Sequence, residues 1–191
     1  MKLRQRLTVG VLAPLVLMLA ACSAPAPKYN ATVDNLRALK SNITTPIGTG
    51  KFQIDPSKPQ LNTIVSRTYT LESPVGNSFA DYLKEAVKTE LAAAGLHQEN
   101  SSLQLSATIL ENQLDVGIKR GTARMSVNFR LDGVNGKLFE QVVTADAVWD
   151  SSFMGAIAIP LGIDNYLALY KQAIGKLISH PGFIAATKTP Q

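Results

Sequence analysis

Residues 103–150 alternate between apolar and polar side chains in three runs, 103–109, 123–132 and 143–150. Successive side chains of a strand point to opposite faces, so a period of two predicts strands with one buried and one solvated face. Gly-Val-Asn-Gly at 133–136 suits a tight turn between the second and third runs. The three runs therefore predict an antiparallel meander.

Two further segments carry apolar residues at helical spacing. The first starts after a cap at Asn77 or Ser78 and ends at Gly95, and the second runs from Asp164 to His180-Pro181-Gly182. The predicted buried stripes are Phe79, Tyr82, Leu83, Ala86, Val87, Leu91 and Ala94 in the first helix and Tyr166, Leu167, Tyr170, Ala173, Ile174, Leu177 and Ile178 in the second.

The remaining segments contribute two strands. Residues 51–54 suggest a short strand, and the β-branched and aromatic run 63–71 suggests another. The expected order is β-β-α-β-β-β-α in a single domain over 31–191. It predicts an α+β fold: a two-layer sandwich in which two helices cover one face of an antiparallel meander sheet.

The N-terminus has the pattern of a secretory signal. Lys2, Arg4 and Arg6 precede an apolar run of about 15 residues, which is shorter than the roughly 20 needed to span a bilayer. Leu19-Ala20-Ala21-Cys22 resembles the lipobox of bacterial lipoproteins, which implies a signal over 1–21 and lipidation of Cys22. Residues 22–30 are small, polar and Pro-rich, as expected of a tether.

The residue at position 23 helps to predict which membrane holds the lipid anchor. By resemblance to enterobacterial lipoproteins, an aspartate there would imply retention in the inner membrane. Ser23 therefore implies an outer-membrane anchor. We expect the domain to face the periplasm, and the cell exterior is the alternative.

Charge and cysteine content exclude several classes of protein. The net charge of +5 falls to +2 without the signal, because 16 basic and 14 acidic residues remain, and no long basic run occurs. Nucleic-acid binding is therefore not expected. The single cysteine excludes a disulfide framework, and two isolated histidines, His97 and His180, give little basis for a metal site.

No catalytic motif is present. The serines lie outside Gly-x-Ser-x-Gly and Ser-x-x-Lys patterns, and Gly48-Thr49-Gly50-Lys51 lacks the rest of a phosphate loop. Asp146 and Asp150 share a strand face but would lie roughly 13 Å apart. We expect a non-enzymatic protein without a cofactor.

The order of several motifs resembles a family. A Phe-x-x-Tyr-Leu helix ending in Ala-Gly-Leu precedes a Leu-Gln-Leu strand and a Gly-Thr-Ala-Arg-Met-Ser-Val strand, and the last helix closes at His-Pro-Gly-Phe. Over residues 60–185 the chain resembles the YajG-type uncharacterised lipoproteins. More distantly, it is similar in architecture to the LptE-type lipopolysaccharide-assembly lipoproteins. The resemblance implies no settled biochemical role.

Two segments are candidate contact sites. Lys119, Arg120 and Arg124 form a small basic cluster that could bind phosphates or an acidic partner; the alternative is a solvated hairpin tip. Residues 153–163 carry no charge and include Phe153, Met154, Ile157 and Ile159. This segment either packs under the second helix or forms an exposed apolar patch.

Two functions are compatible with these features. The first is an outer-membrane-anchored lipoprotein that binds a protein partner or assists envelope assembly. The second is a carrier of lipid or lipopolysaccharide of the LptE type. Burial of 153–163 would favour the first function and exposure the second.

Overall fold

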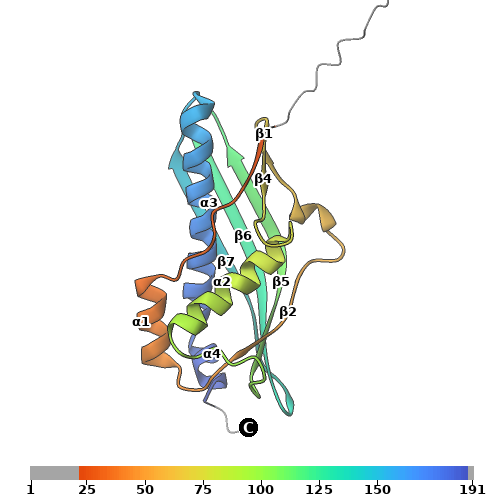
Figure 1. Cartoon of the computed structure of the whole chain (residues 1–191), viewed down its shortest axis with the longest axis vertical. Coiled ribbons are helices and arrows are strands. Elements are labelled where there is room, and N and C mark those ends of the chain that lie inside the picture. Colours follow the sequence, from red (N-terminus) through yellow and green to blue (C-terminus); the bar gives the residue numbers. More distant parts are fainter. Residues whose placement is uncertain (1–21, 189–191) are drawn as a thin grey trace, which may run out of the picture.

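A computed structural model describes residues 22–188, so the predicted signal at 1–21 lies outside the described residues. Its largest element is a four-stranded sheet in the order β2-β5-β6-β7 (Figure 1). The strands are β2 (Gly48–Ile54), β5 (Gln104–Val116), β6 (Arg120–Gly133) and β7 (Gly136–Asp150). The antiparallel meander β5–β6–β7 is confirmed, while β2 adds to β5 in parallel.

A second, three-stranded sheet has the order β1-β4-β3. It comprises β1 (Cys22–Pro25), β3 (Ile64–Ser66) and β4 (Tyr69–Glu72). The prediction of one strand over 63–71 is wrong, because Arg67 adopts a φ of 56° and turns the chain into a hairpin.

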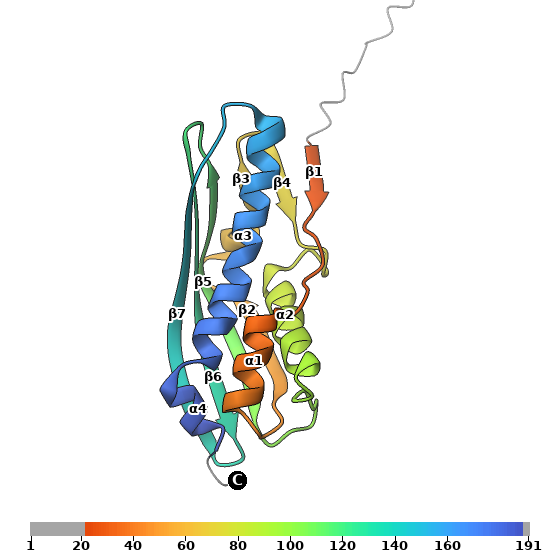
Figure 2. The same ribbon diagram turned by 90° about the vertical axis from the view of Figure 1, so that its left-hand side faces the viewer.

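Two helices cover one face of the large sheet (Figure 2). They are α2 (Phe79–Ala93) and α3 (Gly155–Ile178), and the unpredicted α1 (Val33–Asn42) packs on both. A 3₁₀ turn, η1 (Pro59–Asn62), and a short helix, α4 (Pro181–Ala186), complete the elements. The α+β class is confirmed, and the second sheet and α1 make the arrangement more elaborate than one sheet and two helices.

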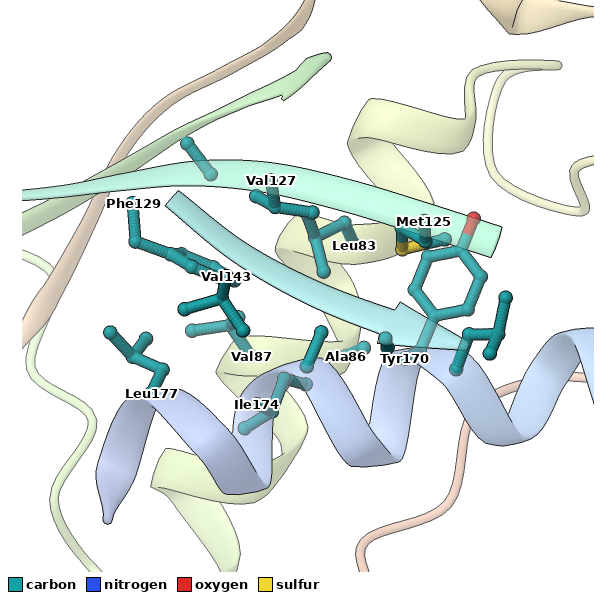
Figure 3. Close-up of a cluster of buried hydrophobic side chains, with 14 of the residues drawn as sticks. Leu83, Ala86, Val87, Met125, Val127, Phe129, Val143, Tyr170, Ile174 and Leu177 are labelled. Atoms are coloured by element: carbon teal, nitrogen blue, oxygen red, sulfur yellow. The ribbon is translucent and has the colours of Figure 1, made fainter. Parts of the chain in front are cut away.

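The core lies between the helices and the inner face of the large sheet (Figure 3). Val127 and Phe129 of β6 meet Leu83 and Val87 of α2 and Ile174 of α3, and all five are buried. The predicted face assignment of the central strand is therefore confirmed.

Strand β5 continues seven residues beyond its predicted end because it contains a bulge. The register shifts between Ile109 and Glu111, after which Asn112, Leu114 and Val116 face inward. An extra residue in one strand moves the side chains that follow it to the opposite face of the sheet. The regular alternation of apolar and polar residues in the sequence therefore ends at Ile109.

Helix α3 starts at Gly155, nine residues before the predicted cap at Asp164. Pro160 lies in the second turn of the helix, where the missing N–H affects only the start of its hydrogen-bond ladder. The small residues Ala158 and Gly162 face the sheet and are buried.

Residues 22–30, predicted to form a tether, lie against the domain. Strand β1 pairs with β4, Ala26 is buried, and Tyr82 Oη donates to the Pro27 carbonyl at 2.9 Å. Tyr29 is half-buried and donates to Glu90 Oε1 at 2.6 Å. The chain therefore joins the fold from its first described residue.

Candidate functional site

One end of the elongated molecule brings together four segments distant in the sequence (Figures 1 and 2). They are the start of β1 at Cys22, the β3–β4 turn at 67–68, the β5–β6 turn at 117–119 and the β7–α3 connection at 151–154. We call this region the Cys22 end. It contains most of the residues that the sequence singles out.

Arg67 links the loops of the Cys22 end through hydrogen bonds. Its guanidinium donates to the carbonyls of Val116 (2.7 Å) and Gly117 (3.0 Å) on one side, and of Ser152 (2.6 Å) and Phe153 (3.3 Å) on the other. Five N–H donors in a planar fork suit this bridging role. Arg67 therefore fixes the β5–β6 turn relative to the start of α3.

Two glycines allow close packing beneath this end. A Cβ on Gly121 would lie 2.2 Å from the Trp149 ring, and one on Gly162 would lie 2.4 Å from Val116 Cγ2. Both distances are too short for a methyl group, so these glycines let Trp149 and α3 approach the sheet.

Exposed apolar side chains gather at the Cys22 end. Six of the ten large apolar side chains exposed among residues 22–188 lie on β3, in the β5–β6 turn or at the start of α3, which meet there: Val65, Ile118, Phe153, Met154, Ile157 and Leu161. Phe153 is 77% and Ile157 53% exposed, whereas Ile159 is half-buried. The segment 153–163 is therefore amphipathic, with Ala158 and Gly162 buried and most of its large residues exposed.

The predicted basic cluster is divided. Lys119 and Arg120 are exposed at the Cys22 end, but Arg124 lies further along β6 on the outer face of the sheet. There its Nε donates to Glu111 Oε2 and its Nη1 to Asp146 Oδ1, both at 2.7 Å. Arg124 is therefore bonded to two carboxylates of the neighbouring strands.

The outer sheet face carries a polar network around Arg124. Ser126 Oγ donates to Glu111 Oε2 at 2.8 Å and lies 2.9 Å from Thr144 Oγ1. Hydrogen bonds from Arg124 and Ser126 lower the pKa of Glu111, and those from Lys137 and Asn128 lower the pKa of Glu140. This face is solvated, and no helix of residues 22–188 covers it (Figure 2).

Strand β7 forms a long open edge. Within residues 22–188, no strand pairs with its side opposite β6. Thr144 directs its carbonyl to Lys176 Nζ on α3 at 2.7 Å, and Ser151 N donates to the Lys119 carbonyl. Because backbone groups alternate along an antiparallel strand, odd-numbered residues from 143 to 151 bond toward β6 and even-numbered ones point outward.

The buried polar groups serve the fold. Glu90 is fully buried, and its carboxyl accepts hydrogen bonds from Tyr29 Oη, from the backbone and hydroxyl of Thr32, and from Asn35 Nδ2 at 2.9 Å. These bonds fasten the N-terminal segment and α1 to α2.

A second buried network links α3 to β5. Tyr166 Oη donates to Asn112 Oδ1 at 2.8 Å and lies 3.0 Å from Tyr170 Oη. Burial raises the pKa of both tyrosines, and it raises that of Tyr82 to about 12.

The two histidines and the glycine-containing segment 48–51 occupy structural positions. His180 Nδ1 accepts from Gly182 N at the start of α4, and His97 Nε2 lies 3.3 Å from Glu99 Oε2. Residues 48–51 belong to strand β2 and do not form a phosphate loop. Among the described residues, no three His, Cys, Asp or Glu side chains form a group able to hold a metal ion.

No helix within residues 22–188 combines the length and the apolar character needed to cross a bilayer.

Comparisons with known proteins identify a similar fold but no family to which the chain belongs. No family model and no curated protein matches the chain. A Xanthomonas campestris protein of the DUF330 family is similar in structure, with a TM-score of 0.58 and 12% identity, over 82% of this chain and 95% of that one. At this identity the similarity shows a shared fold alone.

Two other solved structures are similar with lower TM-scores. A candidate lipoprotein from Caulobacter crescentus has a TM-score of 0.46 and 20% identity, over 82% of this chain and 98% of that one. A minor lipoprotein from Acinetobacter baumannii has 0.38 and 14%, over 71% and 93%. At these TM-scores the two similarities support no conclusion about this chain. The resemblance to YajG- and LptE-type proteins stays a prediction.

Proposed function

We propose that the chain is a non-enzymatic lipoprotein, anchored through Cys22 in the outer membrane, that binds a protein partner in the cell envelope. The open edge of β7 is the observation that carries the partner-binding proposal. A 15-residue edge strand presents a row of backbone groups to which an extended segment of another protein can add.

Side chains along β7 support strand addition. Val142 and Val148 are 47% and 56% exposed on the outer face, where they could contact alternate side chains of an added strand. The strand lacks proline, which commonly protects an edge against pairing.

The proposal that the protein is non-enzymatic is supported by how its polar groups are used. The fully buried carboxyl, Glu90, is held by donors from the N-terminal segment and α1, and the carboxylates near Arg124 are held by that arginine. A general acid or base needs access to a substrate proton, and these groups are already bonded.

The anchor is tested by acylation of Cys22. Labelled palmitate should enter the wild-type chain and not the Cys22→Ala variant, because the variant lacks the thiol that accepts the lipid. Equal labelling of the two chains would contradict the anchor.

The β7 edge is tested by photo-crosslinking in intact envelopes. A crosslinker at Gln141 on β7 should give a protein adduct, and one at Gln113 on the exposed face of β5 should not. Val142→Pro removes an outward N–H and leaves bonds to β6 intact, so it should weaken partner binding by about tenfold. Val142→Ala retains the N–H and is the control.

Two results would contradict strand addition. One is an adduct from Gln113 as strong as that from Gln141. The other is an adduct from Gln141 that is unchanged by Val142→Pro.

A second candidate function is transport of lipid or lipopolysaccharide. As the sequence predicts for a carrier, Phe153, Met154 and Ile157 are exposed, and they lie beside Lys119 and Arg120. This function stands second because it leaves the open edge of β7 without a role. A carrier should bind monomeric lipopolysaccharide, and Lys119→Glu with Arg120→Glu should weaken that binding, more so at low salt. Binding that is indifferent to both substitutions would remove this candidate.

A further inference from the structure

We infer that the Cys22 end is a membrane-docking surface, whose exposed apolar side chains insert into the leaflet that holds the lipid anchor. The inference goes beyond partner binding but shares the proposed anchor at Cys22. It assigns one occupant, the surface of a phospholipid bilayer, to the exposed residues of the Cys22 end.

Exposed apolar surface is concentrated at the Cys22 end. Ile157 and Leu161 of α3 recur at helical spacing with its N-cap residue, Met154, and all three are exposed, so they form a solvent-facing stripe. Phe153 extends this stripe past the start of the helix, and Ile118 lies on the adjoining turn at 67% exposure. Apolar side chains of an amphipathic helix insert about 5–10 Å into the headgroup and acyl boundary of a bilayer.

The proposed anchor at Cys22 lies at the same end of the molecule as this apolar surface (Figure 1). Cys22 pairs with Tyr69 in the small sheet, and Arg67, two residues earlier, donates to the carbonyls of Ser152 and Phe153. The lipidated residue and the apolar stripe are thus linked through one hairpin. Because β1 docks on the domain at once, no free linker separates this end from the membrane.

The Cys22 end is held rigidly by its own contacts. Arg67 bridges the two segments that carry the exposed side chains, and Gly162 lets the start of α3 pack directly on Val116. A surface that is already fixed loses little conformational entropy when it binds. The apolar side chains are therefore held in place for insertion.

Charge contributes little to this docking. Lys119 and Arg120 are offset by Asp115 and Asp150, which are exposed on the neighbouring strands, and Arg120 lies opposite Asp150 in the register. Apolar insertion accordingly predicts attachment that is insensitive to salt and to the charge of the lipid.

The experiment uses the acylated mature chain in vesicles of phosphatidylcholine, with or without phosphatidylglycerol. Acylation consumes the thiol of Cys22, so a cysteine introduced by Phe153→Cys is the single site for an environment-sensitive label. Asn135→Cys, exposed at the β6–β7 turn at the opposite end of the molecule, is the matched control (Figure 1). Flotation with the vesicles reports the anchor, and iodide quenching reports the docking.

Docking predicts severalfold less quenching at position 153 than at 135, equally in both kinds of vesicle. Met154→Asp with Ile157→Asp should restore quenching at 153 without changing thermal stability, because both side chains are exposed. Equal quenching at 153 and 135 in a chain that floats would overturn docking and leave the anchor intact. Protection by lipopolysaccharide monomers but not by phospholipid would overturn it in favour of a carrier site.

A second measurement is independent of the anchor. The unacylated Cys22→Ser chain should still partition weakly into the vesicles, and Phe153→Asp should lower its partition coefficient by about tenfold. Partitioning that does not depend on Phe153 would overturn the docking surface even if acylation is demonstrated. Dependence on Phe153 in a protein that is never acylated would support docking and contradict the anchor.

Discussion

At the scale of single residues, the polar groups that matter most were the least visible in the sequence. Glu90 falls among the charged positions of α2 but is fully buried, because donors distant in the chain converge on it. Arg67 is likewise an arginine within an apparent strand, and no local pattern shows that it bridges two loops. Sequence reasoning missed both residues because their partners are distant in the sequence.

Removal of Glu90 should be strongly destabilising. Glu90→Ala leaves the Tyr29 hydroxyl and the Thr32 N–H without their acceptor and removes one of the two acceptors of the Asn35 amide, at about 3 kcal/mol of unfolding free energy. Glu85→Ala, at an exposed position of the same helix, should change stability little. Urea unfolding of both variants tests this, and similar midpoints would contradict the role of the network.

At the scale of elements, prediction succeeded where the pattern was regular. The meander and α2 follow from periodicity, because burial alone decides which side chains face inward. Helix α1 was missed because it buries only Asn35 and Leu39 and depends on contacts with α2 and α3. The early turns of α3 were missed because Met154, Ile157 and Leu161 form an apolar stripe that faces solvent.

The candidate site was predicted in part. The sequence singled out Lys119, Arg120 and the segment 153–163, which lie together at one end of the structure. It could not show that Arg124 is bound by Glu111 and Asp146, since those partners lie on the two neighbouring strands. The sequence also could not show which strand lies unpaired at the edge of the sheet, because the order of the strands depends on long-range pairing.

The close packing of α3 on the sheet leads to a prediction about Gly162. Gly162→Ala should destabilise the protein by about 1–3 kcal/mol, although alanine favours helix, because its methyl group would meet Val116. Gly155→Ala in the same helix is the control, since its Cβ would find ordinary contacts at 3.8 Å and beyond. Thermal melting of both variants measures the difference; an equal effect would show that α3 is not held this closely.

The two faces of the large sheet give another prediction. Val127→Asp places a charge without a partner in the core and should destabilise by several kcal/mol, enough to unfold the domain. Gln113→Asp on the outer face, opposite Arg124 in the register, should be nearly neutral. Circular dichroism distinguishes the two, and a folded Val127→Asp protein would mean that the inner face is misassigned.

At the scale of the whole molecule, three segments meet around buried aromatic rings. Tyr82 of α2 packs edge-on against Tyr29 of the N-terminal segment and Tyr170 of α3, at centroid distances of 6.5 and 4.8 Å. Tyr166 adjoins Tyr170. The N-terminal segment, α2 and α3 are thus joined by one cluster whose hydroxyl groups are all hydrogen-bonded.

This cluster should make the protein sensitive to alkali. Burial raises the pKa of Tyr29, Tyr82, Tyr166 and Tyr170 above the ordinary 10.0, to about 12 for Tyr82. A raised folded-state pKa leaves stability intact below pH 10 and removes it as pH rises above that value, because the unfolded chain releases its protons first. Tyrosinate absorbance should therefore rise together with unfolding; full ionisation of these tyrosines in a folded protein would contradict their burial.

The parallel pairing of β1 with β4 also has a mechanical consequence. A pull on an anchored Cys22 along the strand would load the β1–β4 bonds together, in shear, and pass tension through Tyr29 into the Glu90 network. Bonds loaded together resist force better than bonds opened one after another. We therefore expect the folded domain to transmit drag or partner tension to its anchor without unravelling from its N-terminus.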